Sequence, residues 1–273
     1  MRRTLKSVLV ALTAASALAA CTTTTVTRTG GGDVVSSTQQ SSAPRQEVNA
    51  RSRAQARVDL AAGYFSNGQM SVALEEARRA VQMDPTFADA YGLLGLIYMQ
   101  LDDRAEAEAN FSRALQLAPA NPDINNNYGW FLCQQPGRER DAIAYFQRAL
   151  RDPLYSTPAR ANLSAGVCLM RVKDYSGAEP YLRRSLELDA ANATTKYELA
   201  RMYLATGRVE RASFYYGLLS KSTEATPATL WLGLKIARAQ GDLRTETALG
   251  NALRNLYPAS VETGWLARGA YDE

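Results

Sequence analysis

The chain repeats one pattern of small, aromatic and polar positions from about residue 51 onward. Prolines mark the period, because Pro85, Pro119 and Pro153 lie 34 residues apart, and alanines, glycines and aromatic residues recur at fixed places between them. A fixed period of this length indicates repeated units of secondary structure. We therefore expect an all-α array over 51–260, in which each unit is two helices joined by a turn, and a short C-terminal cap over 261–273.

The clearest unit ends at Pro119, and it resembles the tetratricopeptide repeat (TPR). Small residues such as Gly95 and Ala107 let the two helices approach closely, larger apolar residues fill the space, and the proline ends the second helix. One such hairpin cannot bury its apolar face alone, so neighbours stack. The resemblance implies a right-handed superhelical array of about six TPR repeats with a concave groove. The sixth repeat is a weaker copy around Trp231 and Gly233.

In a TPR array the first helix of each repeat lines the groove through its second, fifth, ninth and twelfth residues. The first two-thirds of this surface is apolar and aromatic here, and the last third is basic, with Arg201, Lys235 and Arg238. An apolar groove suits a helix or an extended segment of another protein. For each single residue, packing against the next repeat is the alternative. The candidate partner-binding residues are Val58, Phe65, Leu96, Met99, Asn126, Trp130, Leu163, Val167, Tyr197, Arg201 and Trp231.

The first twenty residues have the pattern of a secretory signal. Three basic residues precede an apolar run that is too short to span a bilayer, and the run ends in Leu-Ala-Ala directly before Cys21. This ending resembles the lipidation site of bacterial lipoproteins, which implies a cleaved signal over 1–20 and an acylated Cys21. Thr22 follows the cysteine where an acidic residue would signal retention in the inner membrane, so the outer membrane is favoured. An ordinary secretory signal with an incidental cysteine is the alternative.

Residues 21–50 differ in composition from the repeats. Thr, Ser, Gly and Gln dominate this segment, and it lacks the apolar content that a buried core needs. We expect it to be a flexible tether with a root-mean-square reach of roughly 30 Å.

The charge and composition of the chain exclude several classes of function. The net charge of +4 falls to +1 when the signal leaves, because the signal carries three basic residues and no acidic one. A chain this close to neutral lacks the excess of positive charge that is typical of a nucleic-acid-binding protein. The sequence contains no histidine, which excludes the usual general base of hydrolases and any metal site that uses histidine. We expect no enzyme activity, cofactor, metal ion or small-molecule substrate.

Two cysteines lie within the repeats. Cys133 is the twelfth residue of its repeat, and Cys168 is the tenth residue of the next. The first helices of adjacent repeats run side by side, so a disulfide between the two is sterically reasonable in an oxidising compartment. Two separate thiols in the core are the alternative.

The stretch from Asn126 to Cys133, followed by Gly137 and Arg138, is the least generic part of the array. Together with Cys21, the tether and the six repeats, it resembles the type IV pilus biogenesis lipoproteins, the PilF/PilW pilotin family. The resemblance implies an outer-membrane lipoprotein on the periplasmic face that binds the pilus secretin subunit. It further implies that the protein helps the secretin to reach the membrane, to form its ring and to remain stable, without catalysis.

One other adaptor function shares most of these features. A TPR lipoprotein scaffold for peptidoglycan hydrolases or for outer-membrane protein assembly would also carry a lipid signal, a tether and an apolar groove. It would not account for the stretch from Asn126 to Cys133.

Overall fold

The computed structural model describes residues 49–272, which form thirteen helices and no strand. The predicted signal over 1–20, the predicted acylation site Cys21 and nearly all of the expected tether over 21–50 lie outside the described residues. The helices are α1 (Ala50–Ser66), α2 (Met70–Met83), α3 (Ala88–Gln100), α4 (Arg104–Leu117), α5 (Pro122–Cys133), α6 (Glu139–Ala149), α7 (Pro158–Arg171), α8 (Tyr175–Leu188), α9 (Ala193–Ala205), α10 (Val209–Ser220), α11 (Pro227–Gln240), α12 (Leu243–Leu256) and α13 (Val261–Arg268).

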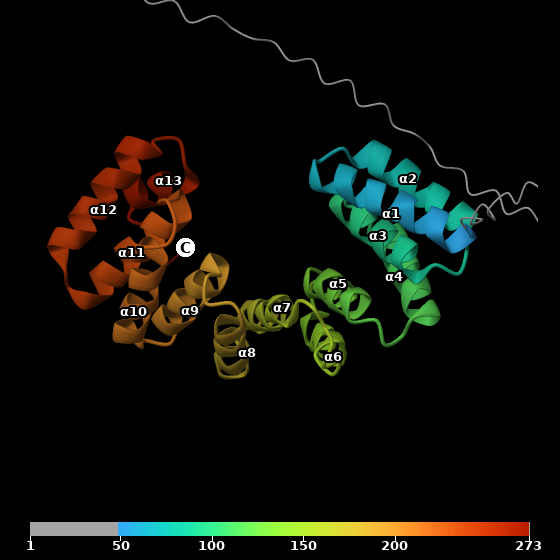
Figure 1. Cartoon of the computed structure of the whole chain (residues 1–273). Helices are drawn as coiled ribbons and strands as arrows, with labels where there is room; N and C mark the ends of the chain where they lie inside the picture. Colours follow the sequence, from blue (N-terminus) through green and yellow to red (C-terminus); the bar gives the residue numbers. More distant parts are fainter. Residues whose placement is uncertain (1–48, 273) are drawn as a thin grey trace, which may run out of the picture. The chain divides into compact units, whose positions relative to one another are not determined.

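The first twelve helices pair as six hairpins, each odd-numbered helix packing on the even-numbered helix that follows it. Consecutive hairpins lie side by side, and the odd-numbered helices of neighbouring hairpins contact one another (Figure 1). The predicted all-α array of six helical hairpins is therefore confirmed. Within residues 49–272 no helix has the length and apolar character that a membrane crossing needs.

Local sequence signals set the ends of these helices. Polar side chains before many helices accept a hydrogen bond from a backbone N–H three residues on, which satisfies one of the free donors of the first turn. Residues that cap in this way include Asn49, Asp103, Asn121, Asp174, Asn192 and Asp242. The turn inside each of the six hairpins contains one residue with a positive φ, at Gly68, Asp102, Gly137, Lys173, Gly207 and Gly241.

Glycines on the first helix of a hairpin make room for a large side chain on the second. A Cβ atom added to Gly95 of α3 would lie 2.7 Å from the ring of Phe111 of α4, and one added to Gly166 of α7 would lie 2.6 Å from Leu182 of α8. Both distances are shorter than real Cβ contacts, so no larger residue fits without a shift. The close approach that the sequence pattern predicts rests on these pairs.

In the sixth hairpin the large residue lies on the first helix and the glycine on the second. Gly233 therefore does not have the role that the sequence alignment gave it. A Cβ atom on Gly233 would meet the ring of Tyr216, which belongs to α10 of the preceding hairpin. The residue of α11 that faces α12 is Leu234, which is fully buried, and it meets Gly250 of α12. The large and small residues have exchanged helices, which explains why this repeat matches the pattern weakly.

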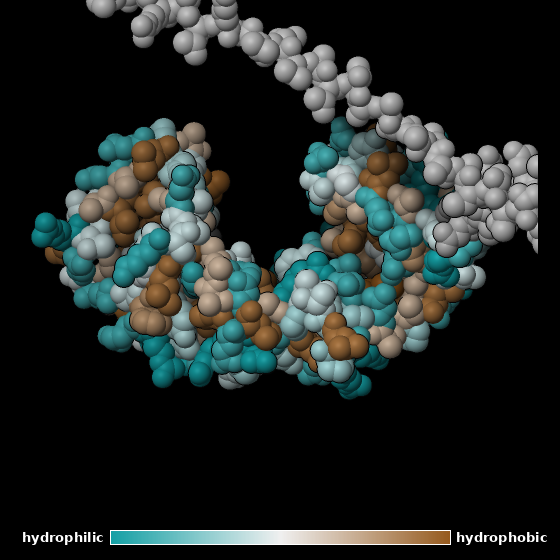
Figure 2. All heavy atoms as spheres, in the orientation of Figure 1, coloured by the Kyte–Doolittle hydropathy of each residue, from teal (hydrophilic) through white to brown (hydrophobic). Residues whose placement is uncertain are grey.

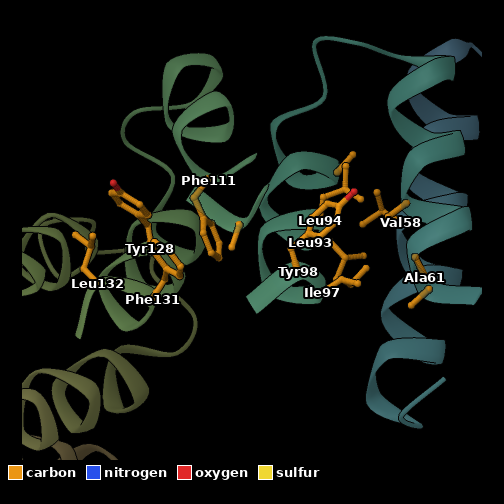
Figure 3. Packing of buried hydrophobic residues seen from close by; sticks show 14 of the residues in the cluster. Val58, Ala61, Leu93, Leu94, Ile97, Tyr98, Phe111, Tyr128, Phe131 and Leu132 are labelled. Atoms are coloured by element: carbon orange, nitrogen blue, oxygen red, sulfur yellow. The ribbon is translucent and has the colours of Figure 1, made fainter. Parts of the chain in front are cut away.

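Apolar side chains form a nearly continuous core along the array. Phe111 of α4 lies 5.8 Å from Tyr128 and 5.7 Å from Phe131, ring centre to ring centre, and both of these belong to α5 of the next hairpin (Figure 3). The largest cluster of buried residues extends from Ala54 to Cys168, and the second begins at Leu169. The boundary between the two clusters therefore falls within α7.

Candidate functional site

All eleven candidate partner-binding residues lie on the odd-numbered helices α1 to α11, and we call them the inner stripe. Seven are half-buried, and Arg201 is exposed. A half-buried side chain on a packed helix rests one face on the core and leaves the other available. Figure 2 shows apolar residues reaching the surface in patches between polar ones. The half-buried members of the stripe are Phe65, Leu96, Met99, Trp130, Leu163, Val167 and Tyr197.

Three members of the stripe are buried. Val58 is 9 % exposed, Trp231 is 5 % exposed and Asn126 is 3 % exposed. Val58 packs in the core that α1 shares with α3, as Figure 3 shows. For these three positions the packing alternative holds, because a partner reaches them only if the protein's own side chains move.

The asparagines at the start of α5 have different surroundings. Asn125 is fully buried, and its side-chain amide donates to the carbonyl oxygens of Pro119 at 2.9 Å and Asn121 at 2.8 Å. It therefore ties α5 to the connection from α4, a structural role that the run of three asparagines did not reveal. The amide nitrogen of Asn126 donates to the Oδ1 atom of Asn127 at 3.4 Å, while its own Oδ1 accepts no hydrogen bond within the described chain.

The basic character expected for the last third of the groove is largely neutralised. Arg201 forms an ion pair of 2.6 Å with Glu198, three residues before it, and Arg238 forms one of 2.8 Å with Glu246 of α12. Burial raises the pKa of the Glu198 carboxyl above its ordinary value, and the neighbouring Arg201 opposes this shift. Since each of these arginines has a carboxylate partner, the groove has little free positive charge to attract an acidic segment.

Cys133 and Cys168 are joined by a disulfide. Their Cα atoms lie 5.7 Å apart, and both residues are almost completely buried. The bond links the end of α5 to α7, so it connects the first helices of the third and fourth hairpins. The structure thus supports the pairing and not the alternative of two separate thiols.

Tyrosine, glutamate and arginine form similar clusters at two places away from the stripe. The hydroxyl of Tyr203 donates to Glu179 at 2.8 Å, and Arg208 donates to the other oxygen of Glu179 at 2.6 Å. In the second cluster Tyr128 and Arg138 both donate to one oxygen of Glu108, at 3.3 and 2.7 Å. Each cluster joins helices of two successive hairpins, and sequence reasoning missed both because the glutamate lies at least 20 residues before its tyrosine and arginine.

The first cluster predicts a pH-dependent stability. Burial and the negative charge of Glu179 raise the pKa of Tyr203 to about 12. The unfolded phenol ionises near pH 10, so above that pH unfolding releases a proton and the folded state loses stability. Tyr203→Phe removes the ionisable hydroxyl. We expect the free energy of unfolding of the wild type to exceed that of Tyr203→Phe at pH 8, and we expect this difference, the stability gap, to narrow between about pH 10 and pH 12. Urea unfolding of both proteins across this range measures the gap, and a gap that does not change with pH contradicts the prediction.

The last helix, α13, packs against α11 and α12 of the sixth hairpin, in the region where a C-terminal cap was expected. Leu266 lies beside Gly250 of α12, 3.4 Å from a Cβ atom added there. Trp265 lies 5.9 Å from Trp231 of α11, ring centre to ring centre, and Tyr271 stacks on Trp231 at 5.6 Å. The chain's own C-terminal segment therefore covers the last member of the inner stripe.

Comparisons with known proteins agree with this architecture. The tetratricopeptide repeat family matches residues 88–121, 137–193 and 169–229. The type IV pilus assembly protein PilF of Pseudomonas aeruginosa is 28 % identical over 207 residues, which cover 76 % of this chain and 82 % of that protein.

Two solved structures are similar over nearly their whole length. The crystal structure of PilW, described as a widely conserved type IV pilus biogenesis factor, is 32 % identical and has a TM-score of 0.75, covering 78 % of this chain and 98 % of that one. The structure of Pseudomonas aeruginosa PilF is 27 % identical and has a TM-score of 0.72, covering 80 % of this chain and 99 % of that one.

Proposed function

Because the chain belongs to the PilF/PilW family of TPR proteins of type IV pilus biogenesis, we propose that it is a pilotin that binds the pilus secretin subunit along its inner stripe. In this proposal the lipid on Cys21 carries the bound secretin to the periplasmic face of the outer membrane. There the protein promotes assembly of the secretin ring and its stability. It acts by binding and anchorage, without a chemical step.

One observation carries the proposal: a row of half-buried apolar and aromatic side chains continues from α1 to α9. Phe65, Leu96, Trp130 and Tyr197 each rest on the core of the array while part of the side chain stays accessible. Side chains that are already ordered lose little conformational entropy when a partner covers them. Large aromatic anchors in such a row are the residues that usually dominate binding energy at an interface. This arrangement suits a helix or an extended segment of the secretin.

Two variants test the two halves of the proposal. Cys21→Ala removes the predicted acylation site, and we expect it to bind the secretin but to leave it outside the outer-membrane fraction, with loss of rings and surface pili.

Trp130→Ala removes the central aromatic anchor, and we expect secretin affinity to fall by about 30-fold, the effect of an interface hot spot of about 2 kcal/mol. Membrane fractionation with immunodetection of secretin rings, together with pull-downs of purified proteins, measures both effects.

A matched control is available for the aromatic anchor. Phe214 of α10 is also a partly exposed aromatic residue, but it lies on an even-numbered helix outside the inner stripe. Phe214→Ala should bind the secretin as the wild type does.

Normal rings and piliation in Cys21→Ala would refute the proposed anchorage by a lipid on Cys21. Unchanged secretin affinity in Trp130→Ala would refute the proposed binding along the inner stripe. A crosslinked pull-down that recovers cell-wall hydrolases or barrel-assembly components instead of secretin would favour the scaffold function.

A further inference from the structure

The ring of Tyr271 lies on the part of α11 that continues the inner stripe. Trp231 and Arg238 are seven residues apart, two turns of one helix, so they share a face of α11. The ring of Tyr271 stacks on the Trp231 indole at 5.6 Å between centres, with an angle of 10° between the planes. The guanidinium carbon of Arg238 lies 3.9 Å from the centre of the same ring.

The backbone after α13 directs Tyr271 to this position. Gly269 ends α13 with a φ of +65°, a left-handed conformation that reverses the direction of the chain. The N–H of Ala270 then donates to the carbonyl of Trp265 at 3.0 Å. The C-terminal segment thus turns back over the sixth hairpin and places an aromatic ring on the stripe.

The contacts of Tyr271 define the chemistry of this position. An indole plane and a guanidinium cation both favour a flat, electron-rich ring. The ion pair between Arg238 and Glu246 holds the guanidinium in place without covering it, since half of the Arg238 side chain stays exposed. No side-chain hydrogen bond of Tyr271 occurs within residues 49–272, so the contacts of its side chain with Trp231 and Arg238 are made by the ring.

We propose that Trp231 and Arg238 form a subsite for an aromatic side chain of the bound partner, and that Tyr271 fills this subsite until the partner displaces it. The inference rests on the proposed function, in which a protein segment lies along the inner stripe. It adds a specificity to that function, because the segment must present a Tyr, Phe or Trp where it reaches α11. Tyr271 is the internal competitor for that residue.

A peptide titration of the full chain tests the subsite without the partner. The probe is a synthetic peptide with the sequence of residues 266–273, which contains the tyrosine but no other aromatic residue, and its control carries Ala in place of that tyrosine. Tyr271→Ala empties the subsite without touching α11, and the indole N–H signal of Trp231 in an NMR spectrum reports occupation. Trp231→Phe assigns that signal among the three tryptophans. We expect Tyr271→Ala to bind the tyrosine peptide at least tenfold more tightly than wild type, a difference of about 1.4 kcal/mol.

The remaining outcomes separate the subsite from unspecific binding. The alanine peptide should leave the Trp231 signal unchanged, and Arg238→Gln in the Tyr271→Ala background should weaken the tyrosine peptide several-fold while the helical circular dichroism is kept. Equal affinity of wild type and Tyr271→Ala, or an equal response to both peptides, overturns the inference.

Secretin binding supplies a second, independent measurement. Tyr271→Ala should bind the secretin more tightly than wild type, because no internal ring competes for the subsite. Equal binding by both proteins contradicts the role of Tyr271 but leaves the proposed function standing. Failure of both proteins to bind contradicts the proposed function, and the peptide titration then still decides whether the subsite exists.

Discussion

Phe111→Ala should lower the free energy of unfolding by about 3–5 kcal/mol, the usual cost of truncating a buried phenylalanine. Phe111 is fully buried. Its ring occupies the space that Gly95 leaves within the second hairpin and contacts Tyr128 and Phe131 of the third. Truncation therefore opens a cavity both inside one hairpin and between two. Chemical denaturation followed by circular dichroism measures the loss.

A second phenylalanine provides the control for this prediction. Phe214 of α10 is 61 % exposed, so Phe214→Ala removes little buried area and should cost less than about 1 kcal/mol. If the two variants lose similar amounts of stability, or if Phe111→Ala unfolds at the wild-type denaturant concentration, the packing of the array does not depend on the contact between hairpins.

Reducing the disulfide between Cys133 and Cys168 should cost about 2–4 kcal/mol. The two cysteines are 35 residues apart, and closing a loop of that length removes about this much chain entropy from the unfolded state. Denaturant unfolding with and without dithiothreitol measures the difference. The double variant Cys133→Ala/Cys168→Ala should resemble the reduced wild type and should not respond to dithiothreitol. A wild type whose stability is the same in both conditions would contradict the prediction.

The regular part of the fold was predictable because its signals are local and repeated. The prolines that end second helices and the small residues opposite Phe111 and Leu182 recur at fixed intervals, so six hairpins could be placed from the sequence, the sixth as a weaker copy. The proximity of Cys133 and Cys168 also followed, since it needs only the rule that first helices of adjacent repeats are neighbours.

The sixth hairpin and its surroundings were not predictable in the same way. The exchange of large and small residues between Leu234 and Gly250 is visible only when both helices are in place, because either residue alone is ordinary for its helix. An aromatic residue at helical spacing has the same pattern whether a partner or the protein itself covers it. The sequence therefore left both readings open for Trp231, and only the structure shows that Tyr271 and Trp265 lie against it.

The ion pairs of Arg201 and Arg238 also show that contacts within a helix can be inferred from the sequence, whereas contacts between helices cannot. The partner of Arg201 is Glu198, three residues earlier on the same helix, and this pair was readable from the sequence. The partner of Arg238 is Glu246, on the helix that follows, and that pairing depends on how α11 and α12 pack. The candidate stripe was thus placed correctly on the first helices, but its exposure and charge depended on contacts between helices.

The disulfide has a mechanical consequence. Cys168 belongs to the larger apolar cluster, and the next residue, Leu169, belongs to the second, so the covalent bond spans α5 and α7 close to the place where the buried core changes from one cluster to the other. Each repeat of such an array contacts only its neighbours, so the movement of one part of the array against the other depends on the interface between two hairpins. Reduction should therefore loosen the third hairpin from the fourth, and the radius of gyration from X-ray scattering should become more variable before any helix melts.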